Sequence, residues 1–376
     1  SRISFGLIFE RQKYKKRSET RFFKQAKIST FTKSIFMGIK SFRQLLVLSF
    51  FGMILSIHGQ EKQDSIVSSP IKLVQPAYLQ QGDTIVLLAP AGILKNREEV
   101  IGKAKDLAES WGLHVVYGNN LFNQGRHFAG TDAERIADFQ AALDNPNIKA
   151  IWAARGGYGT VRILDHLDFT KFKEQPKWVI GYSDITALHS HIHNLGFETI
   201  HGMMGTSMGE ELEEIEKTIE TFKKALFGQQ LTYAIVANKL NRIGESSGVL
   251  VGGNLSILAS MLGSQSQIST KDKILFIEEI GEYKYSIDRM LQSLKRAGFF
   301  ENCKGLIVGD ISNIKKNTTV WGSSIEQLIL DVVAEYDFPV LFNFPAGHEA
   351  DNRALVLGKS IELKVHTEKE ATVVFK

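Results

Sequence analysis

From residue 77 onward, short uninterrupted apolar runs alternate with longer stretches in which apolar residues recur at helical spacing. Uninterrupted apolar runs are typical of strands that are buried on both faces of a parallel sheet. The alternation therefore predicts an α/β fold with helices on the faces of a parallel sheet. In this first region the expected strands cover 84–89, 114–117, 150–154 and 178–180, and the expected helices cover 97–111, 132–143, 161–167 and 185–192.

A second region repeats this pattern after a charged, helix-like segment at 210–227. Because the segment 228–246 has the character of a connector, we predict one domain over 77–227 and another over 247–376. The polar stretch 60–76 is predicted to be a linker in front of both. In the second region the expected strands cover 247–254, 274–279, 305–310, 340–343 and 361–374, and a helix is expected over 285–297.

The N-terminal segment carries the pattern of a secretory signal peptide at 37–59. Lys40 and Arg43 precede an apolar run of 13 residues at 45–57, which is shorter than the roughly 20 residues of a membrane-spanning helix. We therefore expect a periplasmic or secreted protein; an uncleaved membrane anchor and a cytoplasmic location are the alternatives. Residues 1–36 are basic, lack a clear pattern and precede the first methionine, so we expect them to be translated sequence upstream of the true start.

The charge of the chain is divided unevenly. Of 45 Lys and Arg and 41 Asp and Glu, residues 1–59 contain 12 basic and 2 acidic side chains, so 33 basic and 39 acidic ones remain. The part that is expected to fold is therefore mildly acidic, which argues against a nucleic-acid partner because phosphate backbones bind to basic faces. Cys303 is the single cysteine, so an intramolecular disulfide and a cysteine-based zinc site are excluded. We expect no metal and no cofactor.

The motif Gly181-Tyr182-Ser183-Asp184 lies where an expected strand meets an expected helix. A serine at such a turn leaves the sheet beside the free N–H groups of the helix, which is the geometry of a nucleophile elbow. Gly181 leaves room for the tight turn, whereas Ile185 occupies the place where α/β-hydrolases have a second glycine. An ordinary turn is the alternative.

Two other segments, 90–92 (Pro-Ala-Gly) and 155–160 (Arg-Gly-Gly-Tyr-Gly-Thr), also follow expected strands. The carboxyl ends of parallel strands share one edge of the sheet, where ligands bind, so both segments are predicted to meet the serine motif there. The three glycines around Tyr158 would let the backbone approach a substrate closely, although a plain strand-to-helix turn is the alternative. Their spacing is not that of a dinucleotide-binding loop.

A serine nucleophile needs a base, usually a histidine, and that base needs an acceptor on its other ring nitrogen. His348 lies in a turn-rich loop after an expected strand, from which an imidazole can point into a cleft; an ordinary turn residue is the alternative. Glu278 and Glu279 end another expected strand and point to opposite faces of it, and spacing alone allows either one to accept from His348.

The other histidines have less support as the base. His189, His191 and His193 follow the serine motif on a helix, and we expect them to turn away from Ser183 toward a solvated or interface face. His189 and His193 have the spacing of a helical metal pair, but no glutamate stands in the arrangement that a zinc site requires. His201 either lines the cleft or is structural.

Taken together, these motifs resemble the LD-carboxypeptidase family of serine peptidases, whose type member is muramoyltetrapeptide carboxypeptidase. The resemblance covers 77–376, and it implies a triad of Ser183, Glu278 and His348, so it selects Glu278 over Glu279. The motifs that carry it, in matching order, are Leu88-Ala89-Pro90-Ala91-Gly92, Ala154-Arg155-Gly156-Gly157-Tyr158-Gly159, Gly181-Tyr182-Ser183-Asp184, His201-Gly202, Gly252-Gly253-Asn254-Leu255, Phe276-Ile277-Glu278-Glu279, Tyr285-Ser286-Ile287-Asp288-Arg289-Met290-Leu291 and Gly347-His348.

The resemblance also implies the architecture and the substrate. It implies an N-terminal flavodoxin-like domain with a parallel sheet, similar to class I glutamine amidotransferases, and a C-terminal α/β domain with a mixed sheet that supplies the glutamate and the histidine. It further implies a homodimer. The substrate would be a cell-wall tetrapeptide, cut between the L-centre of meso-diaminopimelate or lysine and the terminal D-alanine.

The resulting hypothesis is release of D-alanine through an acyl-enzyme on Ser183. The backbone N–H groups of Asp184 and Gly157 are expected to bind the oxyanion, with Tyr158 in the same substrate-facing loop. Arg155 is a candidate for the terminal carboxylate, with a structural salt bridge as the alternative. Two other functions are considered: a hydrolase of peptidyl-nucleotide antibiotics of the microcin C immunity type, which would share the triad, and a non-catalytic muropeptide-binding protein.

Overall fold

The computed structural model describes residues 73–367 and 369–376, which belong to one compact unit, Pro70–Lys376. The predicted upstream segment 1–36 and the predicted signal peptide 37–59 lie outside the described residues, as does most of the predicted linker 60–76. Among the helices of the described part, none combines the length and the apolar character that crossing a bilayer requires.

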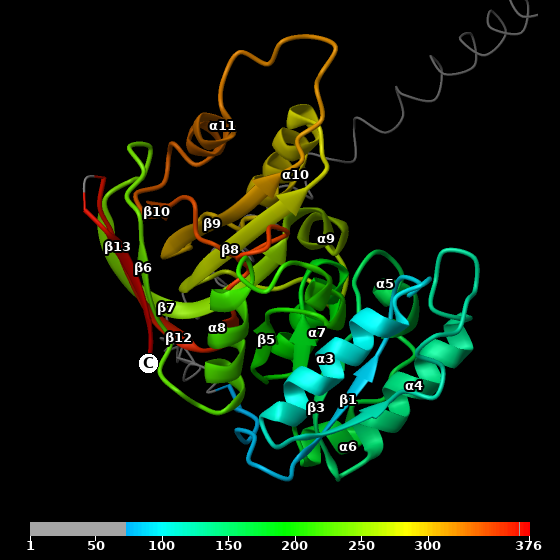
Figure 1. The fold of residues 1–376 in the computed structure, drawn as a ribbon. Coiled ribbons are helices and arrows are strands. Elements are labelled where there is room, and N and C mark those ends of the chain that lie inside the picture. Colours follow the sequence, from blue (N-terminus) through cyan, green and yellow to red (C-terminus); the bar gives the residue numbers. More distant parts are fainter. Residues whose placement is uncertain (1–72, 368) are drawn as a thin grey trace, which may run out of the picture. The chain divides into compact units, whose positions relative to one another are not determined.

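The first sheet has six strands in the order β11-β5-β4-β3-β1-β2; β1, β3 and β5 of this sheet are labelled in Figure 1. Its first five strands along the chain are parallel and have the flavodoxin-like order 2-1-3-4-5. The sixth, from far along the chain, closes one edge in the antiparallel sense. The strands are β1 (Thr84–Leu88), β2 (His114–Tyr117), β3 (Ile148–Ala153), β4 (Trp178–Gly181), β5 (Thr199–His201) and β11 (Leu355–Leu357).

The helices predicted for this sheet are present, and the short helix α6 (Thr170–Glu174) lies outside the predicted ranges. One predicted range needs a correction. The charged segment 210–227 is helical only from Glu216, because 3-10 helix η2 (Gly205–Gly209) and a turn come first. The helix α4 begins with a capping box, in which Thr131 and Glu134 satisfy each other's backbone N–H groups. The helices are α3 (Glu98–Ser110), α4 (Asp132–Asp144), α5 (Thr160–Leu164), α6 (Thr170–Glu174), α7 (Thr186–Asn194) and α8 (Glu216–Leu226).

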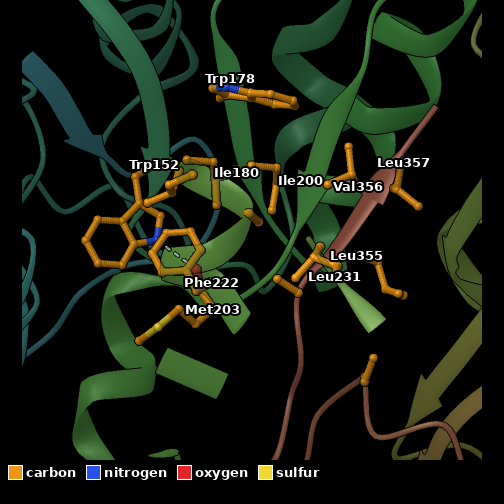
Figure 2. Close-up of a cluster of buried hydrophobic side chains, with 14 of the residues drawn as sticks. Trp152, Trp178, Ile180, Ile200, Met203, Phe222, Leu231, Leu355, Val356 and Leu357 are labelled. Atoms are coloured by element: carbon orange, nitrogen blue, oxygen red, sulfur yellow. Dashed lines mark hydrogen bonds between the residues drawn. The ribbon is translucent and has the colours of Figure 1, made fainter. Parts of the chain in front are cut away.

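The core on one face of this sheet is built from large aromatic and aliphatic side chains (Figure 2). Trp152, Trp178 and Phe222 are each at most 1% exposed. Because Trp152 is buried, its indole N–H needs a partner, and it donates to the carbonyl of Met203 at 2.7 Å. The side chains of β11 join the same cluster, so the strand contributed by the C-terminal part is packed into the first sheet as well as paired with it.

The second sheet has seven strands in the order β10-β9-β8-β7-β12-β13-β6. The strands β7 to β10 are parallel to one another, and β12, β13 and β6 are antiparallel, so the expected mixed sheet is confirmed. The strands are β6 (Thr232–Ile235), β7 (Gly244–Asn254), β8 (Lys273–Ile280), β9 (Gly305–Ser312), β10 (Val340–Leu341), β12 (Ser360–Val365) and β13 (Ala371–Phe375), and the helices are α9 (Leu255–Ser260), α10 (Lys284–Arg296) and α11 (Ile325–Val332).

The histidines of α7 lie between the two sheets, which agrees with the interface alternative and not with the solvated one. His189 is 1% exposed, and its Nε2–H donates to the carbonyl of Gly181, 2.8 Å away. His191 bonds to Ser266 at 2.8 Å, and the ammonium of Lys273 donates to His193 at 2.9 Å. Burial lowers the pKa of His189 to about 4 and that of His193 to about 3. These side chains are therefore neutral and structural, and they contribute to the contact between the two halves of the unit.

Candidate active site

Ser183 stands at the sharp turn between β4 and the 3-10 helix η1 (Ser183–Ile185). Its φ of +62° is in the left-handed region, which costs a non-glycine residue free energy and is typical of functional turns. Gly181 has no room for a side chain, since a Cβ there would lie 2.8 Å from Ile185. At the neighbouring strand end, a Cβ on Gly156 would lie 3.0 Å from the Cβ of Ser183 and 3.3 Å from its Oγ. The position of the Ser183 hydroxyl thus depends on the absence of a side chain at Gly181 and at Gly156.

The structure brings Ser183, His348 and Glu278 into one hydrogen-bonded chain. The distance from Ser183 Oγ to His348 Nε2 is 3.0 Å, and the distance from His348 Nδ1 to Glu278 Oε2 is 2.7 Å. A carboxylate only accepts, so Nδ1–H donates to Glu278 and Nε2 is left to accept from the hydroxyl of Ser183. Ser183 comes from the first sheet and Glu278 from the end of β8 in the second, so the arrangement exists only when both sheets are in place.

The surroundings favour a charged imidazole on His348. Burial by itself lowers the pKa of His348, but the hydrogen bond and the charge of Glu278 outweigh it and raise the pKa above the ordinary value. Glu278 is fully buried, so its charge acts through little solvent. Tyr182 packs its ring against the imidazole edge-on, with centroids 5.1 Å apart. The imidazole of His348 is therefore held by a hydrogen bond on one side and by a ring contact on another.

The two neighbouring carboxylates have separate partners, a distinction that spacing left open. Glu279 accepts from the backbone N–H of Ser256 at 2.7 Å and from the side chain of Asn254 at 3.2 Å. It thereby holds the start of α9, while Glu278 faces His348.

The loop that follows β3 lies against the serine turn, and the predicted binding residues have different places in it. The predicted donor Asp184 has its backbone nitrogen 3.4 Å from the position of a Cβ on Gly156, and its carboxylate accepts from the N–H of Thr160 at 2.8 Å. Gly157 has φ +103° and lies against Gly92 instead of against Ser183. Gly156 is thus the glycine of this loop that touches the serine.

Arg155 and Tyr158 occupy the outer side of that loop. The guanidinium of Arg155 donates to the carbonyl of Ile93, and no carboxylate of the described residues forms a salt bridge with it. Tyr158 is 48% exposed and packs against Phe128 with centroids 5.9 Å apart. Both side chains lie near the carboxyl ends of the strands. Arg155 has further N–H donors besides the one bonded to Ile93, and about half of Tyr158 is exposed.

Several residues that support the site gave no usable signal in the sequence. Arg135 of α4 is 1% exposed and donates to the carbonyls of Pro90 at 2.5 Å and Gly159 at 2.9 Å. It therefore ties two strand ends together, although an arginine on a helix is usually at the surface. Asn352 accepts from the backbone N–H of Gly347 at 3.1 Å and so fixes the loop that carries His348.

The cleft reading of His201 is not supported, because the imidazole is fully buried. Its ring lies between Tyr182 and Phe276, with centroids 5.9 Å and 5.0 Å away. Burial lowers its pKa well below the ordinary value, so His201 is a neutral packing residue behind the site. Within residues 73–367 and 369–376, no three His, Cys, Asp or Glu side chains gather in a way that could hold a metal ion.

Known proteins similar to this chain identify its family. Residues 85–202 match the model of the LD-carboxypeptidase N-terminal domain, and residues 247–363 match that of the LD-carboxypeptidase C-terminal domain. A probable murein peptide carboxypeptidase of Bacillus subtilis is 36% identical over 304 residues, which covers 80% of this chain and 94% of the relative. A murein tetrapeptide carboxypeptidase of Pseudomonas aeruginosa is 28% identical over 291 residues, 74% of this chain and 92% of the relative.

Solved structures with the same fold include a carboxypeptidase. The muramoyltetrapeptide carboxypeptidase from Oxalobacter formigenes superimposes with a TM-score of 0.70 at 28% identity, over 78% of this chain and 98% of that one. An MccF-like protein from Bacillus anthracis superimposes with a TM-score of 0.72 at 25% identity, over 80% and 99%. The chain belongs to the LD-carboxypeptidase family.

Proposed function

We propose that this protein is a serine carboxypeptidase that releases the terminal D-alanine from peptidoglycan tetrapeptides. The observation that carries the proposal is the continuous hydrogen-bonded chain from Ser183 through His348 to the buried Glu278. A nucleophile, a base and an orienting acid in this order are the machinery of acyl transfer. The murein peptide names of the relatives support the substrate class.

In the proposed reaction, His348 Nε2 takes the hydroxyl proton of Ser183 as Oγ bonds to the carbonyl carbon that precedes D-alanine. The protonated imidazole then gives that proton to the leaving nitrogen, the C–N bond breaks, and an ester on Ser183 remains. A water molecule, activated by the same imidazole, hydrolyses the ester and restores the serine. Glu278 keeps Nδ1 protonated and stabilises the positive charge that forms on His348 in both steps.

We assign the backbone N–H of Asp184 as the first oxyanion donor, because it lies at the start of the helical turn beside Oγ. Gly157 and Tyr158 belong to the loop that would form the opposite wall. Arg155 has one N–H group bonded to Ile93, and its other donors can bind the terminal carboxylate of D-alanine. We further propose export through the segment 37–59 and function as a homodimer, as the family resemblance implies.

A second candidate, hydrolysis of a peptidyl-nucleotide of the microcin C type, is favoured by the similarity to the MccF-like protein of Bacillus anthracis. It would use the same three residues. The two candidates differ only in substrate, so the same experiment can separate them.

The test compares the wild-type protein with Ser183→Ala and with a control, Ser110→Ala, whose hydroxyl only donates to a carbonyl on the exposed side of α3. Mass spectrometry follows D-alanine release from a muramoyl tetrapeptide and, separately, cleavage of a peptidyl-sulfamoyl nucleotide. We expect release from the tetrapeptide by the wild type and by Ser110→Ala, and none by Ser183→Ala at an unchanged melting temperature. Tight binding of the tetrapeptide without turnover by the wild type would contradict the proposal, as would an active Ser183→Ala.

A further inference from the structure

Arg135 of α4 is a buried cation that the proposed reaction does not use. Its side chain is 0% exposed, and a guanidinium is not deprotonated in proteins. Burial of a charge costs free energy unless the charged group is paired and hydrogen-bonded. Arg135 pairs with Asp132, and the rest of its guanidinium lies at the carboxyl edge of the first sheet.

One nitrogen of that guanidinium joins two loops at this edge. Nη1 of Arg135 donates to the carbonyl of Pro90 at 2.5 Å and to the carbonyl of Gly159 at 2.9 Å. Pro90 follows β1, and Gly159 ends the glycine-rich loop 155–159, which follows β3. Both hydrogen bonds have a charged donor, which makes them stronger than bonds between neutral groups. The cation therefore holds the ends of the two loops together.

Asp184, the residue after the nucleophile, holds the glycine-rich loop from the other side. It is 1% exposed, and its Oδ2 accepts from the backbone N–H of Thr160 at 2.8 Å. The carbonyl of Gly159 and the N–H of Thr160 belong to one peptide group. That peptide group is therefore held at its oxygen by a guanidinium and at its nitrogen by a carboxylate.

The start of the same loop lies between Ser183 and the loop after β1. The carbonyl of Gly156 accepts from the N–H of Gly92 at 3.0 Å. In a trans peptide the C=O and the next N–H point in opposite directions, so the N–H of Gly157 points away from Gly92. The strand order β4-β3-β1 puts Gly92 and Ser183 on opposite sides of β3. The N–H of Gly157 is therefore directed to the side of Ser183.

This orientation has little local support, because the loop is built from glycines. Gly157 and Gly159 have φ of +103° and +137°, where residues with a side chain are rare. Rotation of the peptide between Gly156 and Gly157 would turn its carbonyl toward the oxyanion in place of its N–H. The hydrogen bonds at the two ends of the loop oppose this rotation.

We propose that Arg135 and Asp184 are positioning residues for the oxyanion site. By holding the Gly159–Thr160 peptide from both sides, they fix the glycine-rich loop in the orientation that presents the N–H of Gly157 to the oxyanion. Neither side chain has to touch the substrate for this role. The inference rests on the proposed serine chemistry, and it is independent of which peptide the enzyme cleaves.

The first test uses a fluorophosphonate, which reports on the oxyanion site without the natural substrate. Ser183 Oγ bonds to phosphorus, the P–F bond breaks, fluoride leaves, and His348 takes the serine proton, while the phosphoryl oxygen takes the place of the oxyanion. Arg135→Met keeps the length of the side chain and removes its donors. We expect the labelling rate of this variant to fall by about 10- to 100-fold.

Arg162→Met is the matched control. The guanidinium of Arg162 also bonds to Asp132, and it lies 5.2 Å from the ring centre of Phe128, compared with 4.9 Å for Arg135. Its side chain is 45% exposed and forms neither of the two carbonyl bonds. Arg162→Met should label at the wild-type rate. An equal loss in this control would assign the effect to Asp132 or Phe128 and overturn the inference.

Two further variants keep the test independent of the folding of Arg135→Met. Arg135→Lys retains the buried charge but not the planar group that reaches both carbonyls, so it should label at an intermediate rate. Asp184→Ala leaves the N–H of Thr160 without an acceptor, whereas Asp184→Asn keeps an oxygen there. We expect Asp184→Ala to label about 10- to 100-fold more slowly and Asp184→Asn to recover most of that loss. Equal losses in both would overturn the assignment of Asp184.

Turnover of the tetrapeptide separates positioning from a merely structural role. An oxyanion site stabilises the transition state and not the bound substrate, so kcat should fall in the Arg135 and Asp184 variants while KM stays near the wild-type value. A lower melting temperature with unchanged labelling and kcat would overturn the inference, as would a raised KM at unchanged kcat. If the wild type reacts with the fluorophosphonate but releases no D-alanine, the proposed function fails, and the labelling rates still decide the inference.

Discussion

The first sheet holds Ser183 through its backbone, whereas the second sheet holds Glu278 and His348 through burial and charge. Ser183 has a left-handed φ, and Gly156 must lack a side chain for the hydroxyl to keep its place. Glu278 is fully buried and meets the imidazole of His348 at 2.7 Å. We call Ser183 and its glycine neighbours the first half of the site, and Glu278 with His348 the second half. We therefore expect small steric changes to reduce activity through the first half and small changes of charge to reduce it through the second.

The largest effect is expected from Glu278→Gln, which keeps the shape of the side chain and removes its charge. Loss of the orienting acid from a serine triad lowers kcat by about 10⁴-fold in the best-studied case, since the imidazole adopts the wrong tautomer. We expect a loss on the order of 10³- to 10⁴-fold in D-alanine release here. A loss of activity below about tenfold would mean that the shape of the Glu278 side chain, and not its charge, positions His348.

The pH dependence of the same variant gives an independent measure. The proposed mechanism needs neutral His348, so the acid limb of kcat/KM should follow the pKa of His348. In the wild type, burial lowers that pKa but Glu278 raises it further, so the limb lies above the ordinary histidine value. Without the charge of Glu278, the pKa falls and the limb should move to lower pH. Glu279→Gln is the control: its hydrogen-bond partners are Ser256 and Asn254, and its charge raises the pKa of His348 less than Glu278 does, so the limb should move less than in Glu278→Gln.

The next largest effect is expected from Gly156→Ala in the first half. Its φ is not in the left-handed region, so alanine is compatible with the backbone, but its Cβ would lie 3.0 Å from that of Ser183. Displacement of a reacting group by an ångström can cost about 100-fold, and we expect a loss of roughly 10- to 100-fold in kcat. Gly102→Ala, where a Cβ on α3 would meet nothing within 4 Å, should leave kcat unchanged. Full activity in Gly156→Ala would show that the serine turn tolerates steric change.

The same contrast explains which elements the sequence could predict. The buried parallel strands and their helices follow directly from apolar runs and helical spacing, and β2 has the predicted bounds. The short strands β5 and β11 were not predicted, because three residues carry no periodicity and β11 pairs with a strand more than 150 residues earlier. The strand β6 lies in the predicted connector 228–246. Its partner β13 is at the far end of the chain, so no local pattern indicates the pairing.

The site shows a similar division. Ser183 and His348 stood out from local patterns, whereas Glu278 was separated from Glu279 only by the family resemblance. The contact of Gly156 with Ser183 joins two strand ends, so no local pattern could reveal it.

The smallest effect is expected where the two halves meet. Thr186, at the start of α7, is fully buried and its hydroxyl accepts from the backbone N–H of Asn254 at the end of β7, at 3.0 Å. Valine has the shape of threonine, so Thr186→Val leaves that N–H buried without an acceptor, which should lower the free energy of unfolding by about 1–3 kcal/mol. Urea denaturation measures the loss, and Thr232→Val on the exposed side of β6 is the control.

The rate of Thr186→Val then decides what the contact between the halves contributes. If the backbone alone positions Ser183, and burial and charge alone position Glu278 and His348, kcat of Thr186→Val should stay within about threefold of the wild type while its free energy of unfolding falls. A loss of kcat similar to that of Gly156→Ala, at unchanged stability, would contradict this division, because Thr186 lies only three residues after Ser183. The serine would then depend on the second sheet for its position as well as for its base.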